Sequence, residues 1–190
     1  MRFIILFAAA YIVGSINISI GLFWILGRED PRAQFSGNPG ATNVYRQVGL
    51  VWAVVVLLLE MAKAIILTIT ARHILVLYQV PWIGVGLILG NHFPCFHRFR
   101  GGKGVANYLG FATVISPMSA VIGMLLWLMA YGATRQPFIG SFVMVLTLSM
   151  GSIIRCGTHA VAVMGTMVTM GMIYYAHKKN VIEWITKYTR

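Results

Sequence analysis

The stretch FSGNPGATNVYRQVG, residues 35–49, is polar and glycine-rich, and it separates two apolar runs that are each long enough to cross a bilayer. The runs extend from Phe3 to Leu26 and from Gly49 to Thr70. A loop that only joins two membrane helices needs no particular side chains. This one concentrates hydroxyls, side-chain amides, glycines and one guanidinium, which are donors suited to a phosphorylated ligand. We therefore expect a membrane fold whose function lies in its loops.

The composition is that of a polytopic integral membrane protein. Of the 190 residues, 58% are hydrophobic and 10% are charged, and the mean hydropathy is +0.80, whereas soluble domains carry about 25% charged residues. The apolar runs predict an all-α fold of about seven transmembrane helices in one membrane-embedded domain, residues 1–190. The predicted helices cover residues 3–26, 49–70, 74–89, 105–115, 118–133, 138–154 and 158–175, followed by a polar tail. The run at 105–115 rises only ~16 Å, so neighbouring helices would have to cover its end.

The net charge of +11 comes from 15 basic and 4 acidic residues. In a soluble chain this surplus would suggest nucleic acid, but in a membrane chain it reflects the excess of Lys and Arg in cytoplasmic loops, so we expect no nucleic-acid partner. With seven crossings, eleven cations lie on one side and three on the other, which makes the first side cytoplasmic. The eleven are Arg28, Arg32, Arg46, Arg98, Arg100, Lys103, Arg135, Lys178, Lys179, Lys187 and Arg190.

A second glycine-rich loop, Gly101-Gly102-Lys103-Gly104, lies on the same predicted side and directly precedes a helical run. Free N–H groups at the start of that helix, together with Lys103, would bind a phosphate. An ordinary basic turn is the alternative. The loop is not a P-loop, because the spacing of that motif and its Ser or Thr after the lysine are absent.

Two further pairs of polar residues are candidates for the same site. Arg46 could bind a phosphate through both of its terminal nitrogens, with Ser36 donating to the phosphate or to a substrate hydroxyl. The alternatives are helix capping by Ser36 and lipid-headgroup contact by Arg46. His177 and Asn180 share a helical face, and His177 could bind phosphate or transfer a proton, or could simply be a histidine favoured at a helix end.

Metal and cofactor chemistry find no support in the sequence. The four acids are Glu29, Asp30, Glu60 and Glu183, and no two have the spacing of a two-metal site. None of the histidines has a metal-ligand spacing with a carboxylate or thiolate, so we expect no metal and no other cofactor. Lys63 follows Glu60 by three residues, and the simplest interpretation is a structural ion pair.

These motifs resemble the bacterial acyl-phosphate:glycerol-3-phosphate acyltransferases over nearly the whole length. The resemblance is carried by Ser36–Arg46, by Phe93-Pro94 leading to Gly101-Gly102-Lys103-Gly104-Val105-Ala106, and by His177 with Asn180; Gly14-Ser15 also fits. It implies a seven-helix enzyme of the bacterial inner membrane with a cytoplasmic active site. The implied reaction moves a fatty acyl group from acyl phosphate to the 1-hydroxyl of glycerol 3-phosphate, giving lysophosphatidic acid and phosphate.

The family's functional residues can be assigned to matching positions of this sequence. The resemblance implies catalytic roles for Ser36, Arg46, Lys103 and His177. It implies substrate-binding roles for Asn38, Gly40, Thr42, Asn43, Gly101, Gly102, Gly104, Ser141 and Asn180. Acyl phosphate is already activated, so no covalent acyl-enzyme, metal or cofactor is implied. The substrates and membrane lipids are the expected partners, and the oligomeric state is left open.

The chain departs from the family pattern at several positions. Asn17 stands where a proline is usual, Asn91 where a histidine is usual, and Glu60 where an aspartate is usual. Glu183, with Trp184 and Thr189, replaces residues of the usual C-terminal motif, and Glu183 adds a negative charge near the expected phosphate site. A diverged paralogue that acts on another polyol phosphate or acyl donor is therefore an alternative.

Two other functions remain as alternatives, and a third is disfavoured. The first is a non-catalytic membrane protein that binds phospholipid or phosphate without turnover. A transporter ranks lower, because no inverted repeat is detectable. An acyltransferase of the acyl-CoA type would need a histidine followed five positions later by an aspartate, and no histidine here has one.

Overall fold

The computed structural model describes residues 1–188, and among these residues it contains helices and no strand. Thr189 and Arg190, which the sequence places in the altered tail, lie outside the described residues. The helices are α1 (Arg2–Ser15), α2 (Ile18–Ile25), α3 (Ala41–Val48), α4 (Leu50–Ile74), α5 (Val80–His92), α6 (Val105–Ile115), α7 (Pro117–Thr134), α8 (Pro137–Arg155), α9 (Ala160–Ala176) and α10 (Lys178–Tyr188). Short 3-10 helices are η1 (Pro31–Ala33), η2 (Leu77–Gln79) and η3 (Cys95–His97). The all-α prediction is confirmed.

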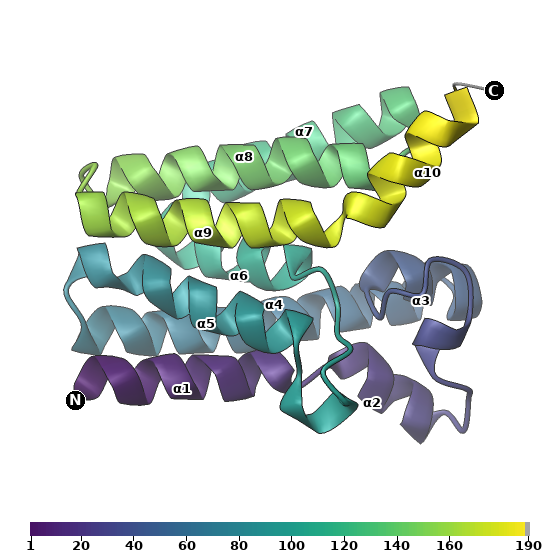
Figure 1. Cartoon of the computed structure of the whole chain (residues 1–190), viewed down its shortest axis with the longest axis horizontal. Coiled ribbons are helices and arrows are strands. Elements are labelled where there is room, and N and C mark those ends of the chain that lie inside the picture. The colour runs from purple at the N-terminus through teal and green to yellow at the C-terminus, as the bar shows by residue number, and fades with distance from the viewer. Residues whose placement is uncertain (189–190) are drawn as a thin grey trace.

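The long helices lie side by side in one bundle (Figure 1). The N-terminus is at one end, while α2, α3, α10 and the loop between α5 and α6 are at the other (Figure 1). Helix α1 packs on α5, α4 on α6, α7 on α8, and α5 also on α9. The polar loops and the tail therefore share one end of the bundle, as the charge pattern predicted.

Helix length and hydropathy identify the segments that could cross a membrane. Within residues 1–188 there are four such segments: residues 2–25, α4, α7 and α8. There are five if α9 and α10, which are bent by 47° at their junction, are counted together as one segment. Helices α5 and α6 are shorter, and α6 is buried against α4, α7 and α8 along most of its length, so protein rather than lipid covers it. The prediction of seven crossings stays a prediction.

The expectation of one continuous helix over residues 3–26 is wrong. The helix breaks between Ser15 and Ile18, and Asn17 caps α2 by accepting a hydrogen bond from the Ile20 N–H at 3.1 Å. The backbone groups freed by the break find side-chain partners on α4. The Ile18 N–H donates to Glu60 at 2.9 Å, and Lys63 donates to the Ile16 carbonyl. A break at this depth is tolerated because its backbone groups are satisfied inside the protein.

Glycines allow α1 and α5 to approach each other closely. A Cβ atom added to Gly14 would lie 2.1 Å from the Leu87 carbonyl oxygen, and one added to Gly90 would lie 2.0 Å from that of Tyr11. Both distances are well inside van der Waals contact, so only glycine fits. Such small-residue crossings are the usual way for helices to pack tightly in a membrane. The contact holds the end of α5 against the helix break.

Two other boundaries differ from those predicted. The first polar loop, predicted over residues 27–46, is partly helical, because Val44 on α3 packs in a buried cluster with Phe23 and Val56. The third predicted helix begins at Val80 rather than residue 74, since α4 continues to Ile74 and Pro81 occupies the first turn of α5.

Candidate active site

Lys103 lies at the centre of the polar cluster at the loop end of the bundle. Its ammonium group donates a hydrogen bond to the Asn180 side-chain oxygen on α10. Burial lowers the pKa of Lys103 to about 8; the negative charge of Glu183 opposes this shift, and the positive charge of Arg46 adds to it. Lys103, Arg46, Glu183 and Asn180 are therefore near enough to act on one another, although they come from three separate segments. The expected charge of Glu183 near this site is confirmed.

His177 joins the cluster at the junction of α9 and α10. Its side chain is 3% exposed, and its Nδ1 lies 2.8 Å from the Ile173 carbonyl oxygen. Because a carbonyl can only accept, Nδ1 carries the proton and Nε2 of the neutral ring is an acceptor. Burial, with the nearby charge of Lys103, lowers the pKa of His177 to about 4. At neutral pH the ring is uncharged, so His177 can act as a hydrogen-bond acceptor or weak base but not as a cation for phosphate.

The Gly101–Gly104 loop folds tightly against the end of α5. The Gly101 N–H donates to the His92 carbonyl at 3.1 Å, and the Gly102 N–H donates to the Asn91 carbonyl at 2.9 Å. These two N–H groups are thus used within the protein, and the substrate roles expected for Gly101, Gly102 and Gly104 stay predictions. Gly104 has a left-handed φ of +80° and leads directly into α6. The N–H groups left for an anion are those of the first turn of α6.

Three asparagines surround Gly102. A Cβ atom placed on Gly102 would lie 3.1 Å from the side-chain oxygen of Asn91, and 3.8 Å from the side-chain amides of Asn17 and Asn38. The Asn91 oxygen is buried and has no hydrogen-bond partner among the described residues. Sequence reasoning named only Asn38 and Gly102 here. The available signal was that Asn17 and Asn91 replace the usual proline and histidine, and the structure shows that both replacements face the same glycine.

Only some residues of the first polar loop lie near the cluster. Asn38 lies beside Gly102, and the positive charge of Arg46 acts on Lys103, although the Arg46 side chain on α3 is exposed. Asn43 is buried and donates to the carbonyls of Pro31 and Gln34, at 2.8 and 3.3 Å, so it holds the loop in shape.

No hydrogen bond or ion pair among the described residues joins three predicted site residues to the cluster. Ser36 and Thr42 are exposed. The Ser141 hydroxyl faces its own helix and α7, because it donates to the Pro137 carbonyl at 2.9 Å and accepts from the Trp127 indole at 3.4 Å. Their substrate roles, like that of Gly40 beside Asn38, stay predictions.

A buried ion pair supports the cluster from beneath. Lys63 and Glu60 approach to 2.8 Å, which confirms the predicted pair, and Asn107 on α6 donates to the same Glu60 oxygen, Oε2, at 2.7 Å. The carboxylate therefore connects α4 to α6 as well as to the α1–α2 break. At that break, the Ser19 hydroxyl donates to the Pro39 carbonyl at 2.9 Å, which ties the first polar loop to the same point.

Comparison with known proteins identifies the family. The family model described as glycerol-3-phosphate acyltransferase matches residues 4–187. The chain belongs to the glycerol-3-phosphate acyltransferase family. Similar members include the glycerol-3-phosphate acyltransferase of Pseudomonas aeruginosa, which is 32% identical over 173 residues, covering 90% of this chain and 89% of the relative. The protein of the same name from Anaeromyxobacter dehalogenans is 35% identical over 183 residues, covering 93% and 90%.

Two solved structures of the family have the same fold. Both are crystal structures of PlsY, an integral membrane glycerol 3-phosphate acyltransferase, and each is 28% identical and covers 98% of this chain. The glycerol 3-phosphate form has a TM-score of 0.90 and the lysophosphatidic acid form one of 0.88, with 94% and 93% of those chains covered. This acyltransferase is therefore an integral membrane protein.

Within residues 1–188, no three His, Cys, Asp or Glu side chains lie close enough together to hold a metal ion. The charges near Lys103 that could act on a phosphate are instead those of Lys103 and Arg46.

Proposed function

We propose that this chain transfers a fatty acyl group from acyl phosphate to the 1-hydroxyl of glycerol 3-phosphate, giving lysophosphatidic acid and phosphate. The single observation that carries the proposal is the cluster in which Lys103, Asn180, His177 and the charge of Arg46 meet at one end of a membrane bundle. Membership of the family and the likeness to structures with glycerol 3-phosphate and lysophosphatidic acid support the acceptor and product.

Lys103 and Arg46 would bind the phosphate of glycerol 3-phosphate by charge. A bound dianion would stabilise the Lys103 ammonium and so offset the effect of burial on its pKa. Asn180 holds the ammonium in place from α10. The neutral His177 ring, with Nε2 as its acceptor, would orient a substrate hydroxyl.

The chemical step needs no protein nucleophile, because acyl phosphate is a mixed anhydride. The hydroxyl oxygen attacks the acyl carbon, the tetrahedral intermediate collapses, and the bond from the acyl carbon to the phosphate oxygen breaks. The hydroxyl proton leaves with the phosphate. The residues contribute positioning and stabilisation of charge, which are sufficient for an activated donor. No step requires a metal or a covalent acyl-enzyme.

The membrane setting belongs to the same proposal. The end of the bundle that carries the two polar loops holds most of the cations, so it faces the cytoplasm of a bacterial inner membrane. Glycerol 3-phosphate would enter from water, and the acyl chain would remain in lipid. The whole chain, residues 1–190, would act as a single membrane-embedded acyltransferase domain.

The test is an assay of purified protein with acyl phosphate and labelled glycerol 3-phosphate in the presence of a metal chelator. We expect labelled lysophosphatidic acid, and its loss in Lys103→Met and Arg46→Gln. Arg28→Gln, which removes an exposed cation from the first polar loop, is the control and should keep full activity. Product only with acyl-CoA or an acyl carrier protein thioester would contradict the donor.

A non-catalytic phosphate binder is the second candidate, because the carboxylate of Glu183 is close enough for its negative charge to act on Lys103. Such a protein would bind inorganic phosphate or phospholipid but form no product with any acyl donor. In that case Glu183→Arg would strengthen phosphate binding without creating activity. If product forms with the unaltered chain, this candidate is refuted.

A further inference from the structure

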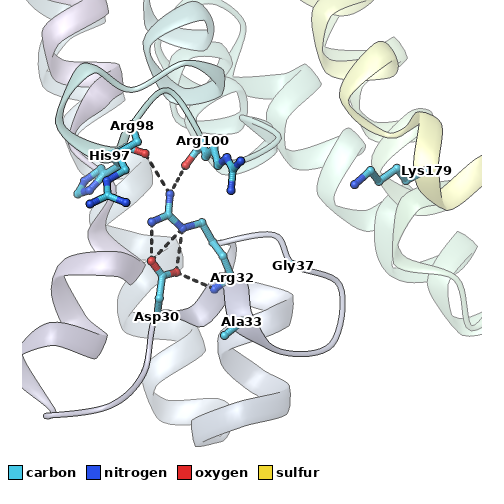
Figure 2. Close-up of a pocket in the computed structure, with 9 residues that line it drawn as sticks. Asp30, Arg32, Ala33, Gly37, His97, Arg98, Arg100 and Lys179 are labelled. Atoms are coloured by element: carbon cyan, nitrogen blue, oxygen red, sulfur yellow. Dashed lines mark hydrogen bonds and ion pairs between the residues drawn. The ribbon is translucent and has the colours of Figure 1, made fainter.

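A cationic hollow lies beside the candidate active site and shares Gly101 with it. It has a volume of about 480 Å³ and is formed by the first polar loop, the loop between α5 and α6, and α10. Figure 2 shows Arg32 between Asp30 and the loop that connects α5 to α6. Lys179 extends from α10 toward the same hollow. Lys103, His177 and Asn180 are not among the described residues that line it.

The charges of this hollow do not balance. Asp30 and Arg32 form an ion pair at 2.5 Å, and hydrogen bonding from Arg32 lowers the pKa of Asp30, so this pair is neutral overall. Arg98, Arg100 and Lys179 also line the hollow. Within residues 1–188 none of these three side chains has an ion-pair partner. Three positive charges therefore face one volume without a counter-ion from the described protein.

The wall that carries two of these cations is held in an unusual conformation. Arg98 and Phe99 both have left-handed backbone angles, with φ of 55° and 57°, which is uncommon for residues other than glycine. Arg32 holds the carbonyls on either side of this pair, donating to His97 at 3.2 Å and to Arg100 at 2.5 Å. Such strain persists only where the surroundings maintain it, and it is concentrated at functional sites.

We propose that this hollow is a peripheral binding site for a phosphate-bearing anion, outside the reaction centre. Two guanidinium groups and one ammonium suit the several oxygens of a phosphate better than a single carboxylate. The anion could be a soluble phosphate or the phosphate of a lipid headgroup, since both present the same oxygens. The hollow lies beside Gly101, two residues before Lys103. An anionic substrate held there would be concentrated at the entrance of the active site. This last role rests on the proposed function, whereas phosphate binding does not.

The test is binding of inorganic phosphate to the full-length protein in a neutral detergent, measured by equilibrium dialysis with labelled phosphate. We expect two classes of site. Arg98→Gln/Arg100→Gln should weaken phosphate binding at the peripheral class of site by on the order of tenfold or more, since it removes two charge-assisted contacts. Lys103→Met should weaken phosphate binding at the other class, which we assign to the active site. Arg28→Gln/Arg135→Gln, which also removes two exposed cations, is the matched control and should change neither.

A variant on another element separates loss of binding from unfolding of the loop. Lys179→Gln on α10 should weaken the same class of site as the arginine variant. The proposal is overturned if a single class of site is found, if the control weakens binding as much as the arginine variant, or if Lys179→Gln leaves both classes unchanged.

Lipid nanodiscs identify the source of the anion. If phosphatidylglycerol displaces labelled phosphate from the peripheral class and phosphatidylcholine does not, the natural anion is a headgroup. If neither lipid displaces it, the anion is a soluble phosphate. Both results support the site, and neither depends on product formation, so failure of the acyltransferase assay remains a separate outcome.

Discussion

Replacing Lys63 by methionine should strongly destabilise the protein, because it leaves the Glu60 carboxylate buried without its counter-ion. The side chains of Lys63 and Glu60 are 13% and 7% exposed, and their charged atoms are 2.8 Å apart. Removing one partner of a buried ion pair costs about 3–5 kcal/mol. The substitution also removes the donor to the Ile16 carbonyl at the α1–α2 break, which adds an unsatisfied backbone group.

The measurement is thermal unfolding in detergent. For a chain of this size, 1 kcal/mol corresponds to about 2–4 °C in Tm, so Lys63→Met should lower the Tm by about 10 °C. The double variant Glu60→Gln/Lys63→Met is measured for comparison with Lys63→Met. It removes the buried charge but keeps a side-chain oxygen for the Ile18 N–H, so it should unfold at a higher temperature than the single variant.

Two outcomes would refute this reasoning. A Tm within about 2 °C of the unaltered protein would mean that water or lipid headgroups already solvate Glu60. A double variant that is as unstable as Lys63→Met would show that the lysine packs the helix break rather than balancing a charge. Lys179→Met is the control for loss of a lysine, since that side chain is exposed.

Three further predictions concern the candidate site. Gly101→Ala should lower both stability and activity, because its Cβ would lie 1.8 Å from the Asn91 carbonyl oxygen; Gly171→Ala, where no atom lies within 4 Å, should be tolerated in the same assays. The KM for glycerol 3-phosphate should rise as pH increases from 7 to 9, because Lys103, with a pKa of about 8, loses its charge in this window; Lys103→Arg should remove the dependence if it binds substrate, and an unchanged profile would contradict the role. His177, with a pKa of about 4, should stay neutral. Any inflection of kcat/KM at about pH 6 should then come from the second ionisation of the substrate phosphate and should persist in His177→Asn; an inflection that disappears in this variant would refute the neutral ring.

The class of fold was readable from local sequence. A bilayer imposes a minimum length on apolar segments, so hydropathy alone predicted an all-helical membrane protein, with α4, α7 and α8 close to their observed bounds. The Glu60–Lys63 pair was also predictable, because residues three apart share a helix face. The motif Ser36–Arg46, with the motifs around Lys103 and His177, predicted the family that the comparison then identified.

The positions of individual side chains were not readable in this way. Hydropathy averages over a window, so it could not show that two polar residues, Asn17 and Ser19, interrupt an otherwise apolar run. The break exists because Glu60 and Lys63, more than 40 residues later in the sequence, satisfy the backbone groups that it frees. The convergence of Asn17, Asn38 and Asn91 on Gly102 likewise depends on how α1 meets α5.

The sequence by itself determined that the chain is a membrane bundle of the glycerol-3-phosphate acyltransferase family with its polar loops at one end, because bilayer thickness and motif spacing act along the chain. Only the tertiary structure decided that the Gly101 and Gly102 N–H groups are used by α5, that His177 is buried and neutral, and that Arg98, Arg100 and Lys179 share a hollow. Those properties depend on distances between separate segments, since hydrogen bonding, burial and charge interactions act through space.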